Sequence, residues 1–147
     1  MSYVFDAGSI LFLTRELGEK VLDAVKQNST TSLAYYEIGN ALWKELNLLK
    51  RLNFNEATKA LKVIFSLLKL MKVVHIENAD LGPKTLSEAS KLDITYYDAA
   101  YLVTAKELGG VLVTDDKKLA TASKKIGVET LSSKSFIQKE EPIWKRP

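Results

Sequence analysis

The sequence predicts an α/β fold in which helices flank a central parallel sheet of about four to five strands. Short apolar runs alternate along the chain with longer segments whose apolar residues recur at helical spacing, which is the pattern of a βα alternation. A length of 147 residues fits one domain that buries roughly 70% of its unfolded surface. We expect this domain to span residues 1–132, followed by a polar C-terminal tail over residues 133–147 with one apolar pair, Ile143-Trp144.

The first half of the chain is predicted to contain two strands, two helices between them and a helical pair. In chain order we expect a strand at Tyr3–Phe5, helices at Ala7–Leu13 and Arg15–Gln27, a strand at Asn28–Leu33, and helices at Ala34–Leu49 and Asn55–Met71. Apolar residues such as Leu42, Leu46 and Leu49 recur every three or four positions, which indicates amphipathic helices. We expect the last two helices to form an antiparallel pair from Ala34 to Met71.

The second half is predicted to continue the alternation. We expect strands at Lys72–Ile76, Val111–Thr114 and Val128–Leu131, and helices at Leu81–Leu92, Tyr96–Leu108 and Lys117–Lys125. Pro83 falls in the first turn of its helix, where a missing N–H group is tolerated. Gly109-Gly110 is a typical helix stop, so the strand that follows it is sharply delimited.

Composition and charge exclude several classes of protein. The chain has no cysteine, which agrees with a reducing cytosol and excludes thiol catalysis and zinc–thiolate sites. No apolar run approaches the roughly 18 residues of a membrane span, and the first residues do not resemble a signal peptide. We therefore expect a soluble cytoplasmic protein. The net charge of +3 and the lysines at 117, 118, 124 and 125 suit a nucleic-acid partner.

Four acidic residues dominate the functional prediction: Asp6, Glu37, Asp98 and Asp116. Each is expected where an apolar strand passes into a helix, or just inside that helix. Strand ends of a parallel sheet gather at one edge, so these carboxylates are expected to meet there and share a divalent cation. Helix capping is the alternative role for Asp6, Asp98 and Asp116. Glu37 lies among apolar residues away from a helix start, so it either faces solvent or has a partner.

Four motifs around these acids resemble the acidic motifs of the PIN-domain nuclease family. They are Val4-Phe5-Asp6-Ala7-Gly8-Ser9, Tyr36-Glu37-Ile38-Gly39-Asn40-Ala41-Leu42, Tyr97-Asp98-Ala99-Ala100-Tyr101 and Leu112-Val113-Thr114-Asp115-Asp116-Lys117-Lys118-Leu119. Their order and spacing agree with that family from Tyr3 to about Leu131. One departure is Gly8, because many relatives have Ser at that position, whereas here Ser9 comes one residue later.

The resemblance implies a three-layer, Rossmann-like PIN domain that cleaves single-stranded RNA with one or two Mg²⁺ or Mn²⁺ ions. It implies that Asp6, Glu37, Asp98 and Asp116 are the catalytic metal ligands. It also implies that Thr114 positions an acidic side chain, and it leaves Asp115 and Ser9 as candidates for contacts around the ligands. The family further suggests the toxin of a VapBC-type toxin–antitoxin pair, a homodimer, and an antitoxin that binds the helical pair from Ala34 to Met71.

Other classes remain as alternatives. A PIN-like domain that processes ribosomal RNA, or one that only binds RNA or a protein, would share the fold, although the presence of all four acids argues against a non-catalytic form. A receiver domain would need an acidic pair after the first strand, whereas Asp6 stands alone there. A haloacid-dehalogenase-like phosphatase would need Asp-x-Asp, and Gly8 fills its second position. Glycine patterns typical of nucleotide cofactor binding do not occur.

Aromatic residues near the acids have two possible roles, stacking on RNA bases or packing in the core or at an interface. The candidates are Tyr35, Tyr36, Trp43, Tyr96, Tyr97 and Tyr101. Aromatic residues at helical spacing more often pack, so we expect packing for most of them. His75, the only histidine, falls in a predicted strand away from the acids, so we expect a structural role for it.

Overall fold

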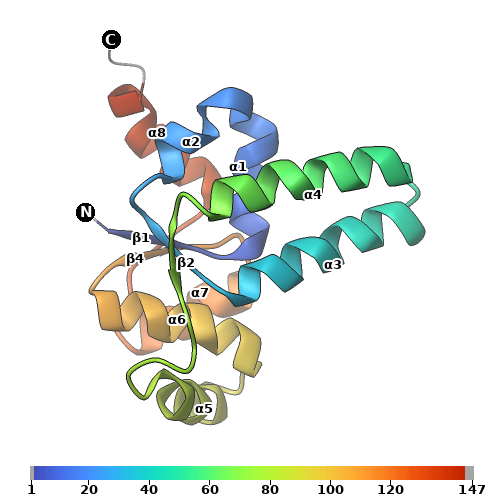
Figure 1. Cartoon of the computed structure of the whole chain (residues 1–147). Helices are drawn as coiled ribbons and strands as arrows, with labels where there is room; N and C mark the ends of the chain where they lie inside the picture. Colours follow the sequence, from blue (N-terminus) through green and yellow to red (C-terminus); the bar gives the residue numbers. More distant parts are fainter. Residues whose placement is uncertain (1, 145–147) are drawn as a thin grey trace.

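Five parallel strands form the centre of the structure, a computed structural model that describes residues 2–144 (Figure 1). The strands β1 (Tyr3–Phe5), β2 (Ser29–Thr31), β3 (Lys72–Val74), β4 (Val111–Val113) and β5 (Thr130–Leu131) lie in the order β3-β2-β1-β4-β5. Every pairing between neighbouring strands is parallel. The predicted α/β fold with a parallel sheet is therefore confirmed.

The chain builds the sheet outward from β1 in two directions. It first adds β2 and β3 on one side of β1, and later places β4 and β5 on the other side. The direction changes between β1 and β4, which pair along their whole length from Tyr3–Val111 to Phe5–Val113. In open α/β sheets a ligand crevice forms outside the carboxyl ends of the strands at such a switch point.

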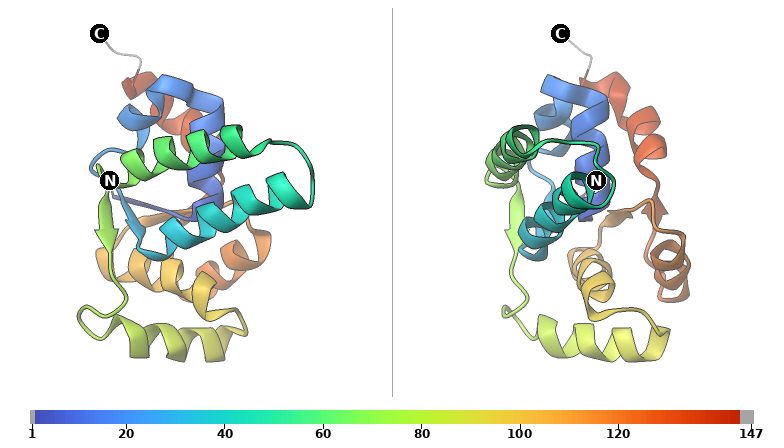
Figure 2. Two further views of the ribbon diagram at one scale, coloured as in Figure 1. Left: turned by 45° about the vertical axis from the view of Figure 1, so that its right-hand side comes forward. Right: turned by 90° about the vertical axis from the view of Figure 1, so that its right-hand side faces the viewer.

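Helices cover both faces of the sheet (Figure 2). One face carries α1 (Ala7–Leu17), α2 (Val21–Val25), α3 (Leu33–Asn47), α4 (Phe54–Leu68) and α8 (Ser133–Trp144), with a 3-10 turn (Gly18–Lys20) between α1 and α2. The other face carries α5 (Leu81–Leu92), α6 (Tyr96–Leu108) and α7 (Lys117–Lys125). The helices α3 and α4 form the predicted pair and project beyond the sheet (Figure 1).

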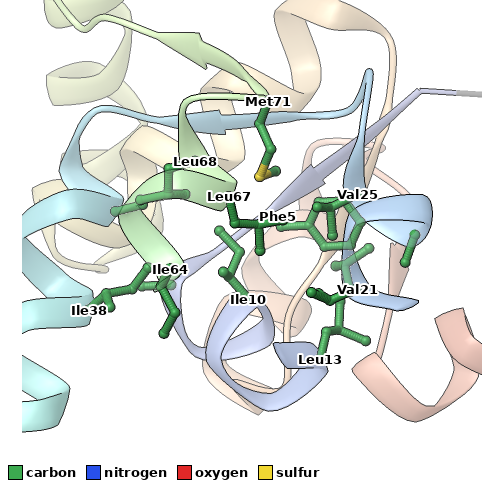
Figure 3. Close-up of a cluster of buried hydrophobic side chains, with 14 of the residues drawn as sticks. Phe5, Ile10, Leu13, Val21, Val25, Ile38, Ile64, Leu67, Leu68 and Met71 are labelled. Atoms are coloured by element: carbon green, nitrogen blue, oxygen red, sulfur yellow. The ribbon is translucent and has the colours of Figure 1, made fainter. Parts of the chain in front are cut away.

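Alternation along the short strands divides the apolar core between the two faces. Tyr3 and Phe5 of β1 belong to the cluster under α1–α4 and α8, whereas Val4 between them belongs to the cluster under α5–α7. Figure 3 shows Phe5 among apolar side chains of α1, α2 and α4. Because all three strand residues are buried, β1 is anchored from both sides. Within residues 2–144, no helix is both long enough and apolar enough to cross a membrane.

The structure corrects two helix boundaries near the N-terminus. The helix expected at Ala7–Leu13 continues to Leu17, and the helix expected at Arg15–Gln27 is reduced to a 3-10 turn and the five residues of α2. Gly18 is the physical reason. Its φ of 54° lies in the left-handed region that glycine adopts at little cost, so it ends α1 as a C-cap.

The expected polar tail is instead a helix that packs on the domain. Phe136 of α8 is 1% exposed, and its ring lies 4.9 Å from that of Tyr3 and 5.0 Å from that of Phe5. The Tyr3 hydroxyl donates a hydrogen bond to Glu140. The prediction failed because most residues of α8 are polar, which leaves a weak apolar period. The side chains of the expected apolar pair, Ile143-Trp144, lie outside the described part of the chain.

Replacing Phe136 by alanine should test whether α8 is part of the folded core. Phe136→Ala removes a buried ring from two edge-to-face contacts, so the free energy of unfolding should fall by about 3–5 kcal/mol. Urea unfolding followed by circular dichroism measures this change. Phe54→Ala, at a phenylalanine that is 69% exposed, is the control and should change stability by less than about 0.5 kcal/mol. Equal effects of the two substitutions would contradict the packing of α8.

Candidate active site

Asp6 and Asp116 lie on either side of the switch point. Asp6 follows β1 directly, and Asp116 follows β4 after Thr114 and Asp115. Both also cap helices, as the alternative prediction allowed. Asp6 Oδ1 accepts a hydrogen bond from the Ser9 N–H at 2.8 Å, and Asp116 Oδ1 accepts from two N–H groups in the first turn of α7 at 2.8 and 3.1 Å. These caps hold one oxygen of each carboxylate, so they are compatible with a further role for the other oxygen.

Glu37 has a specific partner that the sequence did not reveal. It lies in the second turn of α3, just after β2, and its Oε1 accepts a hydrogen bond of 2.7 Å from the Tyr101 hydroxyl of α6. Tyr101 is 1% exposed, so the donor is held in the core. At the other end of α3, Glu45 forms a bidentate ion pair with Arg15 of α1, with Nη1 and Oε1 2.8 Å apart. Glu37 is therefore fixed by its helix and by its hydrogen bond.

Asp98 reaches the same edge by a different route from the one expected. It follows the helix α5, not a strand, and lies in the first turn of α6. Its N–H donates to the Thr95 side chain at 3.1 Å, so Thr95 is the N-cap of α6. Because α6 leads directly into β4 and packs on β1 and β2, its N-terminus lies at the carboxyl edge of the parallel sheet.

Ser9 and Thr114 both contact Asp6. Ser9 is fully buried, and its hydroxyl donates to the Asp6 carbonyl at 2.9 Å. Thr114 is 3% exposed, accepts a hydrogen bond from the Asp116 N–H at 3.1 Å, and hydrogen-bonds to the Asp6 carboxylate. One buried hydroxyl thus links the two acids that flank the switch point.

Asp115 has a structural contact in addition to its place in the acidic motif. Its Oδ1 accepts from the Ser133 N–H at 2.8 Å and its Oδ2 accepts from the Ser133 hydroxyl at 2.6 Å. Ser133 begins α8, so Asp115 satisfies one of the N–H groups that a helix start leaves unpaired. This contact ties the β4–α7 loop to α8. Asp115 also acts on the site electrostatically, because its charge raises the pKa of Asp6.

Burial and mutual repulsion raise the pKa of three of the acids. Burial is the main cause for Asp6, Glu37 and Asp98. The charges of Asp98 and Asp6 raise the pKa of Glu37 further, and the charge of Asp116 does the same for Asp98. Hydrogen bonds from Thr114 and Ser9 to Asp6, and from Tyr101 to Glu37, oppose these shifts. Each of the four acids thus interacts with at least one other through space.

The four acids lie at the same edge of the sheet, but their side chains do not surround a common point where one ion could bind. Within residues 2–144, no three Asp, Glu or His side chains are placed so that they could hold a single metal ion. Lys118 adds a positive charge nearby, since it lowers the pKa of Asp98, and it belongs to the basic flank noted in the sequence. His75 is about half-exposed, and its imidazole Nδ1 lies 3.9 Å from Glu77, in the connection after β3.

The aromatic residues divide between the two roles considered. Tyr101 is buried and Tyr35 packs edge-to-face on Phe65, as expected. Tyr36, Tyr97 and Trp43 are instead 80%, 60% and 49% exposed, and Tyr96 is 39% exposed. These four do not pack in the core of the chain, which the sequence did not indicate because helical spacing does not show which side of a helix faces the core.

Comparison with known proteins identifies the family. The model of the family described as "PIN domain" matches residues 3–125. The chain belongs to the PIN-domain family. A protein named "Ribonuclease VapC3" from Pyrobaculum aerophilum is 35% identical to this PIN domain over 127 residues, which are 82% of this chain and 93% of the relative. "Exonuclease VapC9" from the same organism is 33% identical over 132 residues, or 89% and 93% of the two chains. The family prediction and the expectation of an enzyme are therefore confirmed.

Solved structures share the same fold. The protein PAE2754 from Pyrobaculum aerophilum superposes with a TM-score of 0.77 at 30% identity, over 97% of this PIN domain and 98% of that chain. A chain of a toxin–antitoxin complex from Klebsiella pneumoniae superposes with a TM-score of 0.60 over 90% of this chain and 98% of its own. Its identity of 15% supports the fold alone.

Removing the hydroxyl group that holds Glu37 should change the titration of this acid. Tyr101→Phe deletes a donor that favours the charged carboxylate, so the pKa of Glu37 should rise above its wild-type value. NMR titration of the Glu side-chain carboxyl carbons measures the shift. Tyr35→Phe is the matched control, because Tyr35 lies two residues away and packs through its ring. A Glu37 pKa that is the same in all three proteins would contradict the hydrogen bond.

Neutralising Asp98 should stabilise the metal-free protein in a pH-dependent way. The folded protein binds the Asp98 proton more tightly than the unfolded chain does, so wild-type stability falls as pH rises through the raised pKa. Asp98→Asn removes this loss. Its advantage should be near zero at pH 3 and, after a discount for solvent screening at this half-buried site, at most about 1 kcal/mol at pH 7. Urea unfolding in EDTA measures the difference. Asp93→Asn, at an exposed left-handed C-cap position, is the control for the loss of one carboxylate, and an equal pH-dependent gain in this variant would contradict the prediction.

Proposed function

We propose that this PIN domain is a Mg²⁺- or Mn²⁺-dependent ribonuclease that hydrolyses single-stranded RNA. The observation that carries the proposal is the gathering of Asp6, Glu37, Asp98 and Asp116 at one sheet edge, where three of them have a raised pKa. Crowded carboxylates that repel each other are costly unless a cation compensates their charge. The name of the relative VapC3 supports RNA as the substrate class.

The four acids are suited in chemistry to a hard divalent cation. Carboxylate oxygens are the ligands that Mg²⁺ and Mn²⁺ prefer, so Asp6, Glu37, Asp98 and Asp116 would hold the ion. When bound, the ion supplies a Lewis acid that lowers the pKa of water and neutralises charge on phosphate oxygens. Since no three acids are in place around one position within the described residues, we propose that their side chains rotate on binding.

Uncharged hydrogen-bond donors orient two of these acids. Ser9 and Thr114 hold Asp6, and Tyr101 holds Glu37, which fixes orientation without neutralising the negative charge. Residues of this kind around a metal site typically change affinity or activity by roughly 10- to 100-fold when they are mutated. Lys118, near Asp98, would attract the RNA backbone and compensate part of the phosphate charge.

The biological setting that we propose is a VapBC-type toxin–antitoxin pair. The VapC names of the two relatives support a toxin. The helical pair α3–α4 offers a surface for an antitoxin, because it projects from the sheet and exposes Trp43, Leu48, Leu49, Phe54 and Val63 by 49–69%. Association of two copies of the chain is part of the same proposal. The alternative is a PIN domain that processes ribosomal RNA or only binds its partner.

Cleavage of a labelled single-stranded RNA tests the activity. Wild-type protein should cut with Mg²⁺ or Mn²⁺, stop in EDTA, and leave a 5′ phosphate because water attacks the phosphorus and breaks the bond to the 3′ oxygen. Asp98→Asn should reduce the rate by at least roughly 100-fold. Gel analysis of the products, with end-labelled RNA, measures the rate and distinguishes internal from terminal cleavage.

Asp93→Asn is the matched control for this assay and should retain wild-type activity. Circular dichroism of both variants checks that each is folded. Cleavage that continues in EDTA, or that is equally fast in Asp98→Asn and wild type, would mean that the acids are helix caps and that the proposed chemistry is wrong.

A further inference from the structure

An apolar pocket of about 260 Å³ opens beside two of the acids, where β2 and β3 end. Its walls include Leu33, Tyr36, Val74, Ile76, Tyr96 and Tyr97. Tyr36 directly precedes Glu37 and Tyr97 directly precedes Asp98. Two residues of the pocket wall are therefore sequence neighbours of candidate catalytic acids. The pocket volume is far above the roughly 10–15 Å³ that one water molecule occupies by this measure.

Solvent-exposed tyrosine rings form much of the wall of this pocket. Tyr36 is 80% exposed, Tyr97 is 60% exposed and Tyr96 is 39% exposed. Exposed rings of this size are costly in water and are suited to stacking. All three are carried by α3 and α6, the two helices that also carry Glu37 and Asp98, so their place relative to the acids is fixed by the same scaffold.

The wall of the pocket also offers a hydrogen-bonding group. Thr31 is 5% exposed, and its Oγ1 makes no hydrogen bond of good geometry among the described residues, although this hydroxyl lies near enough to the Tyr101 hydroxyl to lower the pKa of Tyr101. Leaving a buried hydroxyl unpaired is unfavourable, so an occupant with a polar edge would gain from it. None of the side chains that line the pocket carries a charge, which disfavours a phosphate or a charged peptide side chain.

We propose that this pocket binds the base of a nucleotide next to the scissile phosphate, an inference that rests on the ribonuclease function proposed above. A nucleobase is uncharged and planar, and it has apolar faces for the tyrosines and a polar edge for Thr31. A single strand that places its phosphate at Glu37 and Asp98 carries a base on each neighbouring nucleotide, and the pocket lined by Tyr36 and Tyr97 is built on the same two helices as these acids. An aliphatic side chain of a protein partner would leave Thr31 unpaired.

Cleavage of short RNAs that carry one abasic nucleotide tests this subsite. Once the cut position in a fixed sequence is known, an abasic nucleotide is placed at each position around it. For wild type, kcat/KM should fall roughly 10- to 100-fold at one adjacent position, the range that stacking of one base provides. In Tyr36→Ala/Tyr97→Ala the loss at that position should be less than threefold. Tyr97→Phe keeps the ring and should keep the wild-type loss at the abasic position.

Phe54→Ala, which removes an exposed ring at the start of α4, is the control and should discriminate like wild type. Binding of the same RNAs to Asp98→Asn, followed by fluorescence anisotropy, gives the test without cleavage. Base discrimination in binding without any wild-type cleavage would support the pocket and contradict the ribonuclease. Cleavage with equal abasic losses in wild type and the double variant would overturn the subsite. Unchanged discrimination together with a shift from dimer to monomer in sedimentation would assign the pocket to a second copy.

Discussion

The burial of carboxylates at one edge of the sheet, together with their mutual repulsion, is the constraint on which the rest of the site depends. The strand order places the ends of β1 and β4 together at the switch point, and α3 and α6 add one acid each from the flanking layers. Burial makes the charges of Asp6, Glu37 and Asp98 more expensive than they would be in water. A fold that holds them in place therefore stores electrostatic energy, which a bound cation would release.

The surrounding structure supplies the rigidity that this arrangement requires. β1 is buried on both faces, and α8 closes one side of it through Phe136. Asp115 fixes the start of α8, so the loop between β4 and α7 is tied to the C-terminal helix. Among the described residues, the donors that touch Asp6 and Glu37 are hydroxyl and N–H groups and not cationic side chains. These donors therefore orient the carboxylates without neutralising their negative charge.

Most of the fold could be predicted from the sequence because its signals are local. Thr95 marks the start of α6, Gly109 marks its end, and Asp116 marks the start of α7. The bounds of α5 follow from where its apolar spacing starts and stops. The contributions of Tyr101 and α8 could not be predicted, because they depend on contacts between residues far apart in the chain. Asp98 was expected at this edge because a strand was thought to precede it. It lies there because the N-terminus of α6 does, and the element before α6 is the helix α5. The side of α3 that Tyr35 and Tyr36 face is set by packing, which spacing alone does not specify.

Titration with Mn²⁺ tests whether the four acids act together as a cation site. The electron paramagnetic resonance signal of the free ion measures how much Mn²⁺ remains unbound. Wild-type protein should remove Mn²⁺ from solution with one or two ions per chain, and Mg²⁺ should compete. Asp6→Asn should weaken this binding by roughly 10-fold or more, because one charged ligand is lost while its shape is kept. Binding of equal strength in wild type and Asp6→Asn, or no binding by wild type, would contradict the account.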